Sequence, residues 1–153
     1  LYPGETSEQV LDSRLQADAD KIMTRGMYRW AHLQTQSGRS DAYLYFFTHV
    51  PPEEGLERFG AYHGAEVMYA YDNLGADSDA DYAEADHRLR DVMSGYWVSF
   101  VRTGDPNAPG LPAWPTVEQA PDQVMELSSD SGVAPRPRPD AVDFWMRYDG
   151  PIP

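Results

Sequence analysis

One histidine of this sequence stands in a setting that suits acid–base chemistry. Residues 60–66 read GAYHGAE, so His63 lies in a glycine-containing stretch that is expected to form a loop. An imidazole exchanges protons near neutral pH, which makes a loop histidine a candidate general base. The chain has no cysteine, and no serine in a nucleophile-elbow motif, for such a base to activate. The sequence therefore predicts that part of the active site lies outside this chain.

The element directly before this loop is a predicted strand at residues 42–50. Its continuous apolar and aromatic run, AYLYFFTHV, ends at Pro51 and Pro52. Continuous rather than alternating apolarity is typical of a strand buried on both faces of a parallel sheet. We expect residues 51–64 to form a loop and residues 67–71 to form a short helical stretch behind it.

A first helix is predicted at residues 20–37, where apolar side chains recur near a 3.6-residue period. Asp18 or Asp20 is expected to cap its start, and Gly38 its end. The mixed polar residues 5–18 are compatible with a short helix or a loop. A helix that leads into a buried strand is typical of an α/β fold.

The strongest helix pattern covers residues 82–103 and is ended by Gly104. Asp81 and Glu84 have the spacing of a capping box at its start. Its apolar residues share one wide face that we expect to lie against the core: Leu89, Val92, Met93, Tyr96, Trp97, Phe100 and Val101.

The last third of the chain is predicted to hold one short strand and one helix. Residues 105–122 are proline-rich and favour an ordered loop, residues 124–127 a strand, and residues 128–139 turns, before a helix capped by Asp140. A buried parallel strand needs hydrogen-bonding neighbours on both sides, which two predicted strands do not provide. We therefore predict an α/β fold whose sheet is incomplete without another segment.

The composition limits the classes of function. The 153 residues are enough for one domain with a packed core, since 41% are hydrophobic. A net charge of −13 argues against binding to nucleic acid and to anionic membrane surfaces. No apolar run approaches the ~20 residues that span a bilayer, and the lack of cysteine excludes disulfides and thiolate metal sites. The sequence starts without an initiator methionine or a signal-peptide pattern, so we expect it to begin after processing or within a longer polypeptide, in a compartment left open.

Residues 60–66 resemble the catalytic-histidine motif of the type-B carboxylesterases, the family that includes the cholinesterases. Further segments resemble this family in the same order, from a strand through a long helix and its exit to a proline-rich loop. These segments are YLYFF at 43–47, MSGYWVSF at 93–100, TGDPN at 103–107 and LPAWP at 111–115. The resemblance covers residues 20–148 and therefore nearly the whole chain.

The resemblance implies an α/β-hydrolase fold, with residues 1–153 as the C-terminal segment of a single domain. In such hydrolases the nucleophilic serine comes first in the chain, then the acid, then the histidine, so His63 alone is carried over as catalytic. Ser94 and Ser131 each precede a glycine but lack the rest of the G-x-S-x-G motif. We therefore expect the serine, the acid and the oxyanion hole in an N-terminal segment of the same esterase, the partner of this chain.

The implied reaction is the hydrolysis of a small-molecule carboxylic ester, without a cofactor or a metal ion. The 153 residues alone are expected not to turn over esters, because they lack the nucleophile. Glu66 resembles a family glutamate that braces the site without reacting.

Simpler interpretations of these residues stay open. His63 also fits a plain histidine of a surface loop, and Glu66 also fits a cap of the short helix after the loop. His32 in a helix, His49 at a strand end and His87 on a polar helix face are expected to have structural roles.

Two alternatives concern function. Residues 77–81, DSDAD, resemble the opening of a calcium loop, but Tyr82 and Arg88 stand where such a loop needs glycine and glutamate, so we expect a solvated acidic loop. The second alternative is a non-catalytic, cholinesterase-like binding or adhesion protein. The otherwise complete motif around His63 favours the enzyme.

Overall fold

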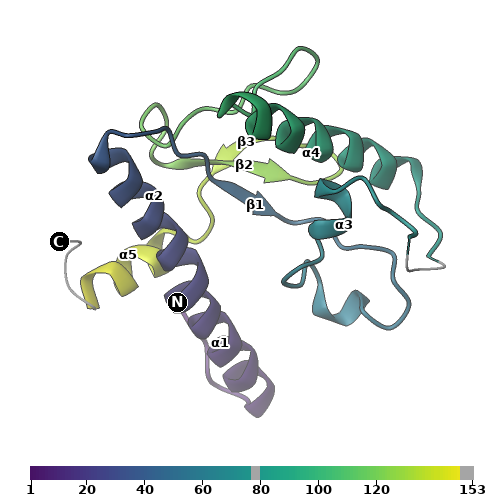
Figure 1. Cartoon of the computed structure of the whole chain (residues 1–153). Coiled ribbons are helices and arrows are strands. Elements are labelled where there is room, and N and C mark those ends of the chain that lie inside the picture. The colour runs from purple at the N-terminus through teal and green to yellow at the C-terminus, as the bar shows by residue number, and fades with distance from the viewer. Residues whose placement is uncertain (77–79, 149–153) are drawn as a thin grey trace.

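One long continuous helix dominates the first part of the chain (Figure 1). The structure is a computed structural model and describes residues 1–76 and 80–148. Helices α1 (Ser7–Ala19) and α2 (Arg25–Ser37) are joined by a single π turn (Asp20–Thr24). Thr6 caps the start, because its Oγ1 accepts a hydrogen bond from the backbone nitrogen of Gln9 at 3.2 Å. Gly38 ends the helix in the left-handed conformation at φ 63°, as predicted.

The prediction that this helix starts near residue 20 behind an aspartate cap is wrong. The helix passes through this position, and the buried carboxylate of Asp20 accepts hydrogen bonds from Arg138 at 2.6 Å and from Tyr2 at 3.0 Å. A π turn contains one extra residue, which shifts the phase of the apolar side chains and hides the full helix from a 3.6-residue pattern. Asp20 thus joins the long helix to the segment before the last helix.

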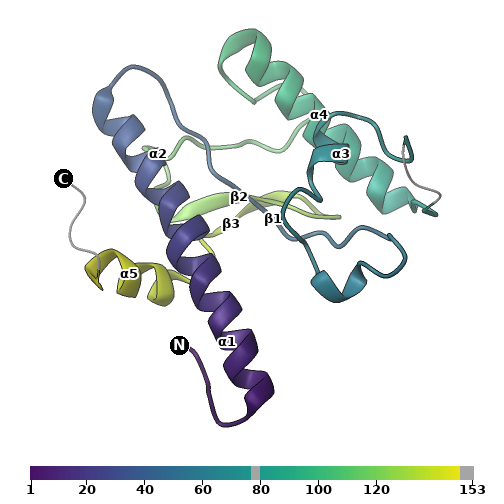
Figure 2. The same cartoon turned by 60° about the horizontal axis from the view of Figure 1, so that its bottom comes forward.

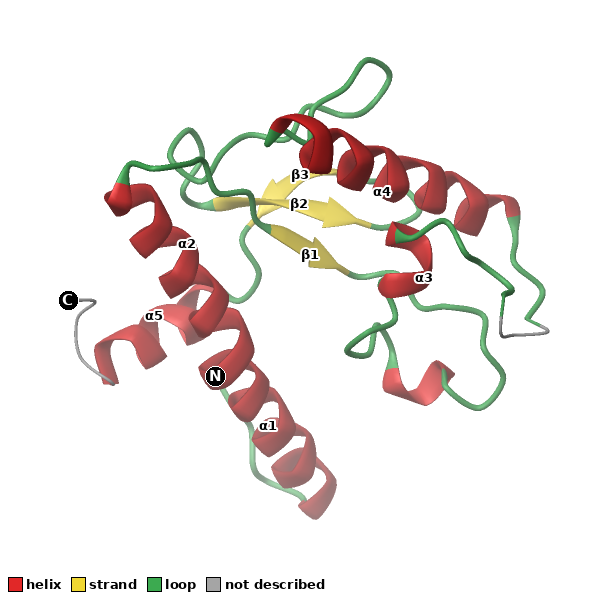
Figure 3. Ribbon diagram, viewed as in Figure 1, coloured by secondary structure: helices red, strands yellow, loops and turns green. Residues whose placement is uncertain are grey.

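The sheet is small and mixed (Figure 3). Strand β1 (Tyr45–Phe47) pairs in parallel with β2 (Gln123–Leu127), and β2 pairs antiparallel with β3 (Gly132–Pro135). The strand at 124–127 is confirmed. The predicted strand at 42–50 shrinks to three residues, and β2 is its only partner in the described part of the chain. The expectation that it is buried on both faces is not met here, since Tyr45 and Phe46 are 39% and 41% exposed.

Strand β3 was missed, because residues 128–139 were expected to form turns. Its four residues include a glycine and a proline, which reduce strand propensity and are tolerated at the edge of a sheet. A turn held by serine hydroxyls connects it to β2, with Ser131 Oγ donating to the Ser128 carbonyl oxygen at 2.8 Å. Short edge strands of this kind carry little signal in sequence.

The remaining helices are α3 (Val67–Ala70), α4 (Glu84–Thr103) and α5 (Pro139–Tyr148). The predicted capping box of Asp81 and Glu84 is wrong, because Asp86 accepts the hydrogen bond from the backbone nitrogen of Ala83 at 2.9 Å. Gly104 ends α4 at φ 79°, as predicted. The last helix begins at Pro139, so Asp140 lies in its first turn instead of capping it.

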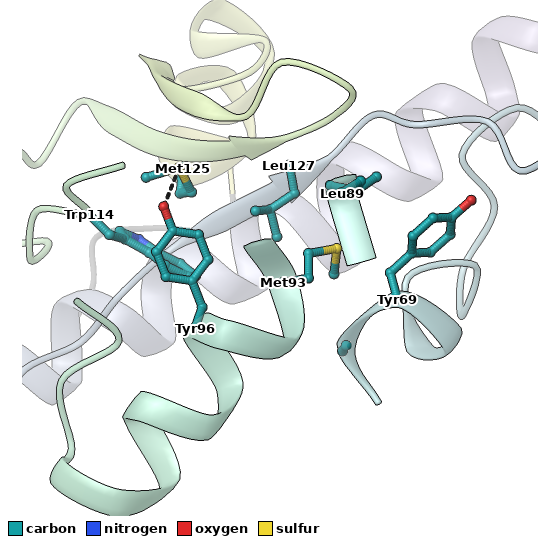
Figure 4. Close-up of a cluster of buried hydrophobic side chains, with 8 residues drawn as sticks. Tyr69, Leu89, Met93, Tyr96, Trp114, Met125 and Leu127 are labelled. Atoms are coloured by element: carbon teal, nitrogen blue, oxygen red, sulfur yellow. Dashed lines mark hydrogen bonds between the residues drawn. The ribbon is translucent and has the colours of Figure 1, made fainter. Parts of the chain in front are cut away.

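The core lies between α4 and the sheet (Figure 4). Its buried members are Tyr69, Ala70, Leu89, Met93, Tyr96, Trp114, Met125 and Leu127. The predicted apolar face of α4 is right in its middle and wrong at its end, where Phe100 is 47% and Val101 82% exposed. The rings of Tyr96 and Trp114 meet edge to face with centroids 4.9 Å apart, a favourable aromatic geometry.

The proline-rich segment after α4 is an ordered loop, as predicted. Asn107 fixes it through two hydrogen bonds to the backbone of Trp114, at 2.7 Å and 3.0 Å. The indole nitrogen of Trp114 in turn donates to the carbonyl oxygen of Leu44, next to β1. This loop therefore connects the end of α4 to the start of the strand that precedes His63.

The long helix and α5 lie together, away from α4 (Figure 2). None of the helices in residues 1–76 and 80–148 combines the length and the apolarity needed to cross a membrane. The calcium-like stretch 77–81 falls largely outside the described residues.

Candidate active site

His63 lies in a loop that two left-handed glycines shape. Gly60, which ends the short 3-10 turn Glu57–Phe59, has φ 62°, and Gly64 has φ 93°. Both values lie in the region that favours glycine over residues with a Cβ atom. The backbone nitrogen of Ala65 donates to the carbonyl oxygen of Tyr62 at 3.1 Å, which closes a turn around His63.

The imidazole of His63 is exposed. Within residues 1–76 and 80–148 it takes part in no hydrogen bond or ion pair. No residue of the described part of the chain therefore occupies its ring nitrogens. The catalytic role of His63 stays a prediction, for which this geometry supplies the setting.

Glu66 folds back onto the loop. Its Oε2 accepts a hydrogen bond from the backbone nitrogen of Gly64 at 3.1 Å, directly beside His63. Glu66 occupies the N-cap position of α3, but its side chain makes no capping bond there. Burial, followed by the negative charge of Glu66, raises the pKa of Tyr45 above its ordinary value. Glu66 thus stabilises the loop between β1 and α3.

A second contact holds the part of the loop that precedes His63. The hydroxyl of Tyr62 donates to Glu53 Oε2 at 2.7 Å. This hydrogen bond, with smaller effects of burial and charge, raises the pKa of Tyr62 to about 12. The residue before His63 is therefore held to the start of the loop.

A buried cluster that sequence reasoning missed lies behind the loop. We call it the Asp86 cluster; it consists of Asp86, His49 and Tyr69. Asp86 Oδ1 lies 2.7 Å from His49 Nε2 and accepts a hydrogen bond from the Tyr69 hydroxyl, also at 2.7 Å. Because the carboxylate accepts, Nε2 of His49 carries the hydrogen. His49 was expected to be structural, but nothing in its spacing indicated these two partners.

Three donors determine the charge state of Asp86. Burial alone raises the pKa of a carboxyl group, but hydrogen bonds from Tyr69, His49 and the backbone nitrogen of Ala83 outweigh it, so the pKa of Asp86 lies below its ordinary value. Burial, and then the bond to Asp86, raise the pKa of Tyr69 far above its ordinary value. The cluster is thus a carboxylate that accepts hydrogen bonds from three surrounding donors.

The other candidate residues are not brought together with His63. The imidazole of His32 lies 3.1 Å from Gln36 Nε2, and that of His87 lies 3.3 Å from an Arg90 nitrogen. Ser94 lies inside α4, and Ser131 bonds within the β2–β3 turn. Neither serine stands on a strand-to-helix elbow.

An apolar cavity of about 650 Å³ lies between α2, β1 and α4. Among its lining residues are Trp30, Tyr45, Trp97 and Phe100, and none belongs to the loop 60–66. Within residues 1–76 and 80–148, no group of three histidines or carboxylates is placed to hold a metal ion. The described site therefore consists of the exposed His63 loop and the buried cluster behind it.

Comparisons with known proteins agree over nearly the whole chain. Residues 2–145 match the model of the carboxylesterase family. The chain is 27% identical to pyrethroid hydrolase Ces2a of Mus musculus, over 95% of this chain and 26% of that protein. It is 29% identical to cocaine esterase of Homo sapiens, over 87% of this chain and 25% of that protein. The chain thus spans about a quarter of the length of the curated relatives it matches.

Solved structures give the same result. Carboxylesterase EST55 of Geobacillus stearothermophilus matches with a TM-score of 0.72 at 25% identity, over 94% of this chain and 29% of that chain. A thermophilic PNB esterase matches with a TM-score of 0.71 at 20% identity, over 94% of this chain and 28% of that chain. The structural neighbours are esterases of the α/β-hydrolase fold, so the predicted fold class is confirmed.

Proposed function

Because this chain belongs to the carboxylesterase family, we propose that it supplies the catalytic histidine, His63, of a serine carboxylesterase. An N-terminal segment of the same esterase provides the serine, the acid and the oxyanion hole. The substrate is a small-molecule carboxylic ester. The polypeptide that contains both the segment and these 153 residues is called the complete esterase below.

The observation that carries this proposal is the setting of His63. Its imidazole is exposed on a loop fixed by Gly60, Gly64 and Glu66, and it has no partner within the described part of the chain. A triad histidine needs one nitrogen facing a serine and the other facing a carboxylate. His63 is exposed and bonds to no residue of the described part of the chain, whereas Nε2 of the largely buried His49 already bonds to Asp86.

His63 then acts as base and acid in turn. It takes the proton of the serine hydroxyl while the serine oxygen forms a bond to the ester carbonyl carbon. The imidazolium then donates this proton to the leaving alkoxide of the substrate as the bond between the acyl carbon and the alcohol oxygen breaks. Water repeats the sequence on the acyl-serine, with His63 taking a proton from water and returning it to the serine oxygen. The products are the free acid and the alcohol.

Glu66 supports this cycle without taking part in it. Its hydrogen bond to the Gly64 nitrogen restrains the backbone next to His63. The carboxylate that orients the imidazole comes, in this proposal, from the N-terminal segment.

The test replaces His63 by alanine in the complete esterase and measures hydrolysis of a chromogenic short-chain ester. We expect kcat to fall by about 10³-fold or more, because both proton transfers are lost, while the unfolding midpoint stays the same. The matched control is His32→Ala, which removes another exposed imidazole and is expected to leave kcat within about twofold.

Retention of turnover by His63→Ala contradicts the proposal. A complete polypeptide that lacks ester turnover but binds a partner protein would instead support the adhesion alternative. The sequence preceding residue 1 gives an independent check, because the enzyme requires a G-x-S-x-G motif after an apolar strand.

A further inference from the structure

The carboxylate of Asp86 connects three segments that precede or follow the His63 loop in the chain. It accepts hydrogen bonds from His49 at the end of β1, from Tyr69 in α3 and from the backbone nitrogen of Ala83 before α4. We propose that Asp86, acting through Tyr69 and His49, is a positioning residue for His63 and sets the activity of the site from behind the loop. This inference rests on the proposed function of His63.

The connection on the exit side of the loop is short. Tyr69 lies in α3, whose backbone nitrogen at Val67 donates to the carbonyl oxygen of Gly64 at 3.1 Å. The backbone nitrogen of Tyr69 donates to the carbonyl oxygen of Glu66 at 3.2 Å, and Glu66 holds the Gly64 nitrogen in turn. These bonds join α3 and the residues after His63 into one unit, which the Tyr69 hydroxyl fastens to Asp86.

The connection on the entry side starts at His49. Its ring packs edge to face on the ring of Tyr69, with centroids 5.5 Å apart, and its Nε2 bonds to Asp86. The fully buried Pro51 follows, and Glu53 then holds the hydroxyl of Tyr62, the residue before His63. Asp86 therefore restrains both ends of the loop.

Restraint from behind matters because the imidazole itself is exposed and has no partner in the described part of the chain. The place of His63 thus depends on its backbone. Catalytic groups must lie within about 0.5 Å of their productive position, and a misplacement of about 1 Å costs on the order of 10²-fold in rate. A loosened loop lowers kcat more than KM, because it disturbs proton transfer and leaves the binding surface in place.

The competing interpretation is that Asp86 only stabilises the fold as a buried capping residue. Two tyrosines, Tyr69 and Tyr96, allow an experiment to distinguish the positioning role of Asp86 from a purely structural role. Tyr69 and Tyr96 are both fully buried, and both hydroxyls form a hydrogen bond of 2.7 Å. The Tyr69 hydroxyl bonds to Asp86, whereas that of Tyr96 bonds to the carbonyl oxygen of Pro112, in the loop after α4.

The experiment compares Tyr69→Phe with Tyr96→Phe in the complete esterase. Both variants lose one hydrogen-bonded hydroxyl, so both are expected to lower the unfolding midpoint, Tyr69→Phe by more because its hydroxyl bonds to a carboxylate. We expect Tyr69→Phe to lower kcat about tenfold with KM within about twofold, and Tyr96→Phe to keep kcat within about twofold. Amide hydrogen exchange of residues 62–66 should be about tenfold faster in Tyr69→Phe and unchanged in Tyr96→Phe.

His49→Asn is a second variant, which detaches the entry side and is expected to change kcat and exchange in the same direction. Equal kcat in the two phenylalanine variants, or unchanged exchange in Tyr69→Phe, overturns the positioning role. Failure of the proposed function is recognised separately, because His63→Ala then retains turnover, while the exchange measurement needs no activity and still decides whether Asp86 holds the loop.

Discussion

Two histidines of this chain, His49 and His63, lie in opposite settings. His49 is largely buried, bonds to Asp86 and packs against two aromatic rings, those of Phe47 and Tyr69. His63 is exposed on a glycine-shaped loop and has no partner among the described residues. On distances alone, His49 with its carboxylate resembles a base with its orienting acid more than His63 does.

In our proposal, a short histidine–carboxylate distance does not by itself identify the catalytic pair. Asp86 accepts hydrogen bonds from three donors, and these bonds join the segment after β1, helix α3 and the start of α4. A catalytic histidine that acts with groups from another segment must instead keep its nitrogens free in this chain. Our proposal therefore gives a structural role to His49, whose Nε2 is bonded, and the catalytic role to His63, which has no partner in the described part of the chain.

Removing the charge of Asp86 tests how much the His49–Asp86 contact and its neighbours stabilise the fold. At pH 7, Asp86→Asn in the complete esterase should lower the free energy of unfolding by about 2 kcal/mol, because an amide cannot accept from all three donors. The folded pKa of Asp86 lies below its ordinary value, so its ionised form stabilises the fold above about pH 4. That contribution is lost as the pH falls through the lowered pKa, and the difference between wild type and variant should shrink.

The measurement is denaturant unfolding of both proteins from pH 7 down to about pH 3. Asp91→Asn, which alters an exposed carboxylate of the same helix, serves as control and should change stability by less than about 0.5 kcal/mol at pH 7. A difference for Asp86→Asn that stays constant or grows towards acid pH would show that the cluster does not depend on the ionised carboxylate.

A smaller effect on stability is expected from a substitution in the His63 loop. Gly64→Ala places a Cβ atom at φ 93°, which costs about 1 kcal/mol of backbone strain although nothing lies within 4 Å of the new atom. Gly26→Ala, in the helix α2 and also with free space, should stabilise the fold by about 0.5–1 kcal/mol. Thermal unfolding of both variants checks the opposite signs; equal signs would mean that the left-handed conformation at Gly64 is not maintained.

Local features were the ones that the sequence predicted well. The glycines around His63, the exit of α4 at Gly104 and the ordered loop around Trp114 all depend on backbone conformation within a few residues. The α/β class was predicted from a helix that leads into an apolar strand. The incompleteness of the sheet was predicted from the small number of other strands in the sequence. The α/β-hydrolase assignment followed from the resemblance.

Features set by distant contacts were missed. The Asp86 cluster joins residues 49, 69 and 86, whose proximity is created by the packing of α3 and β1 against α4. The residue type of Asp20 favours a helix cap, whereas the bond that determines its role comes from Arg138 at the other end of the chain. No spacing rule contains such contacts, because each depends on the tertiary structure.

The central claim is that this chain contributes the base and another segment contributes the nucleophile. The most direct measurement expresses the complete esterase as two polypeptides, divided before Leu1, and assays ester turnover of the co-expressed pair and of each part alone. We predict turnover for the pair, none for residues 1–153 alone, and turnover lowered by about 10³-fold or more for the pair that carries His63→Ala. Turnover by the 153 residues alone, or full turnover of the His63→Ala pair, would contradict the account.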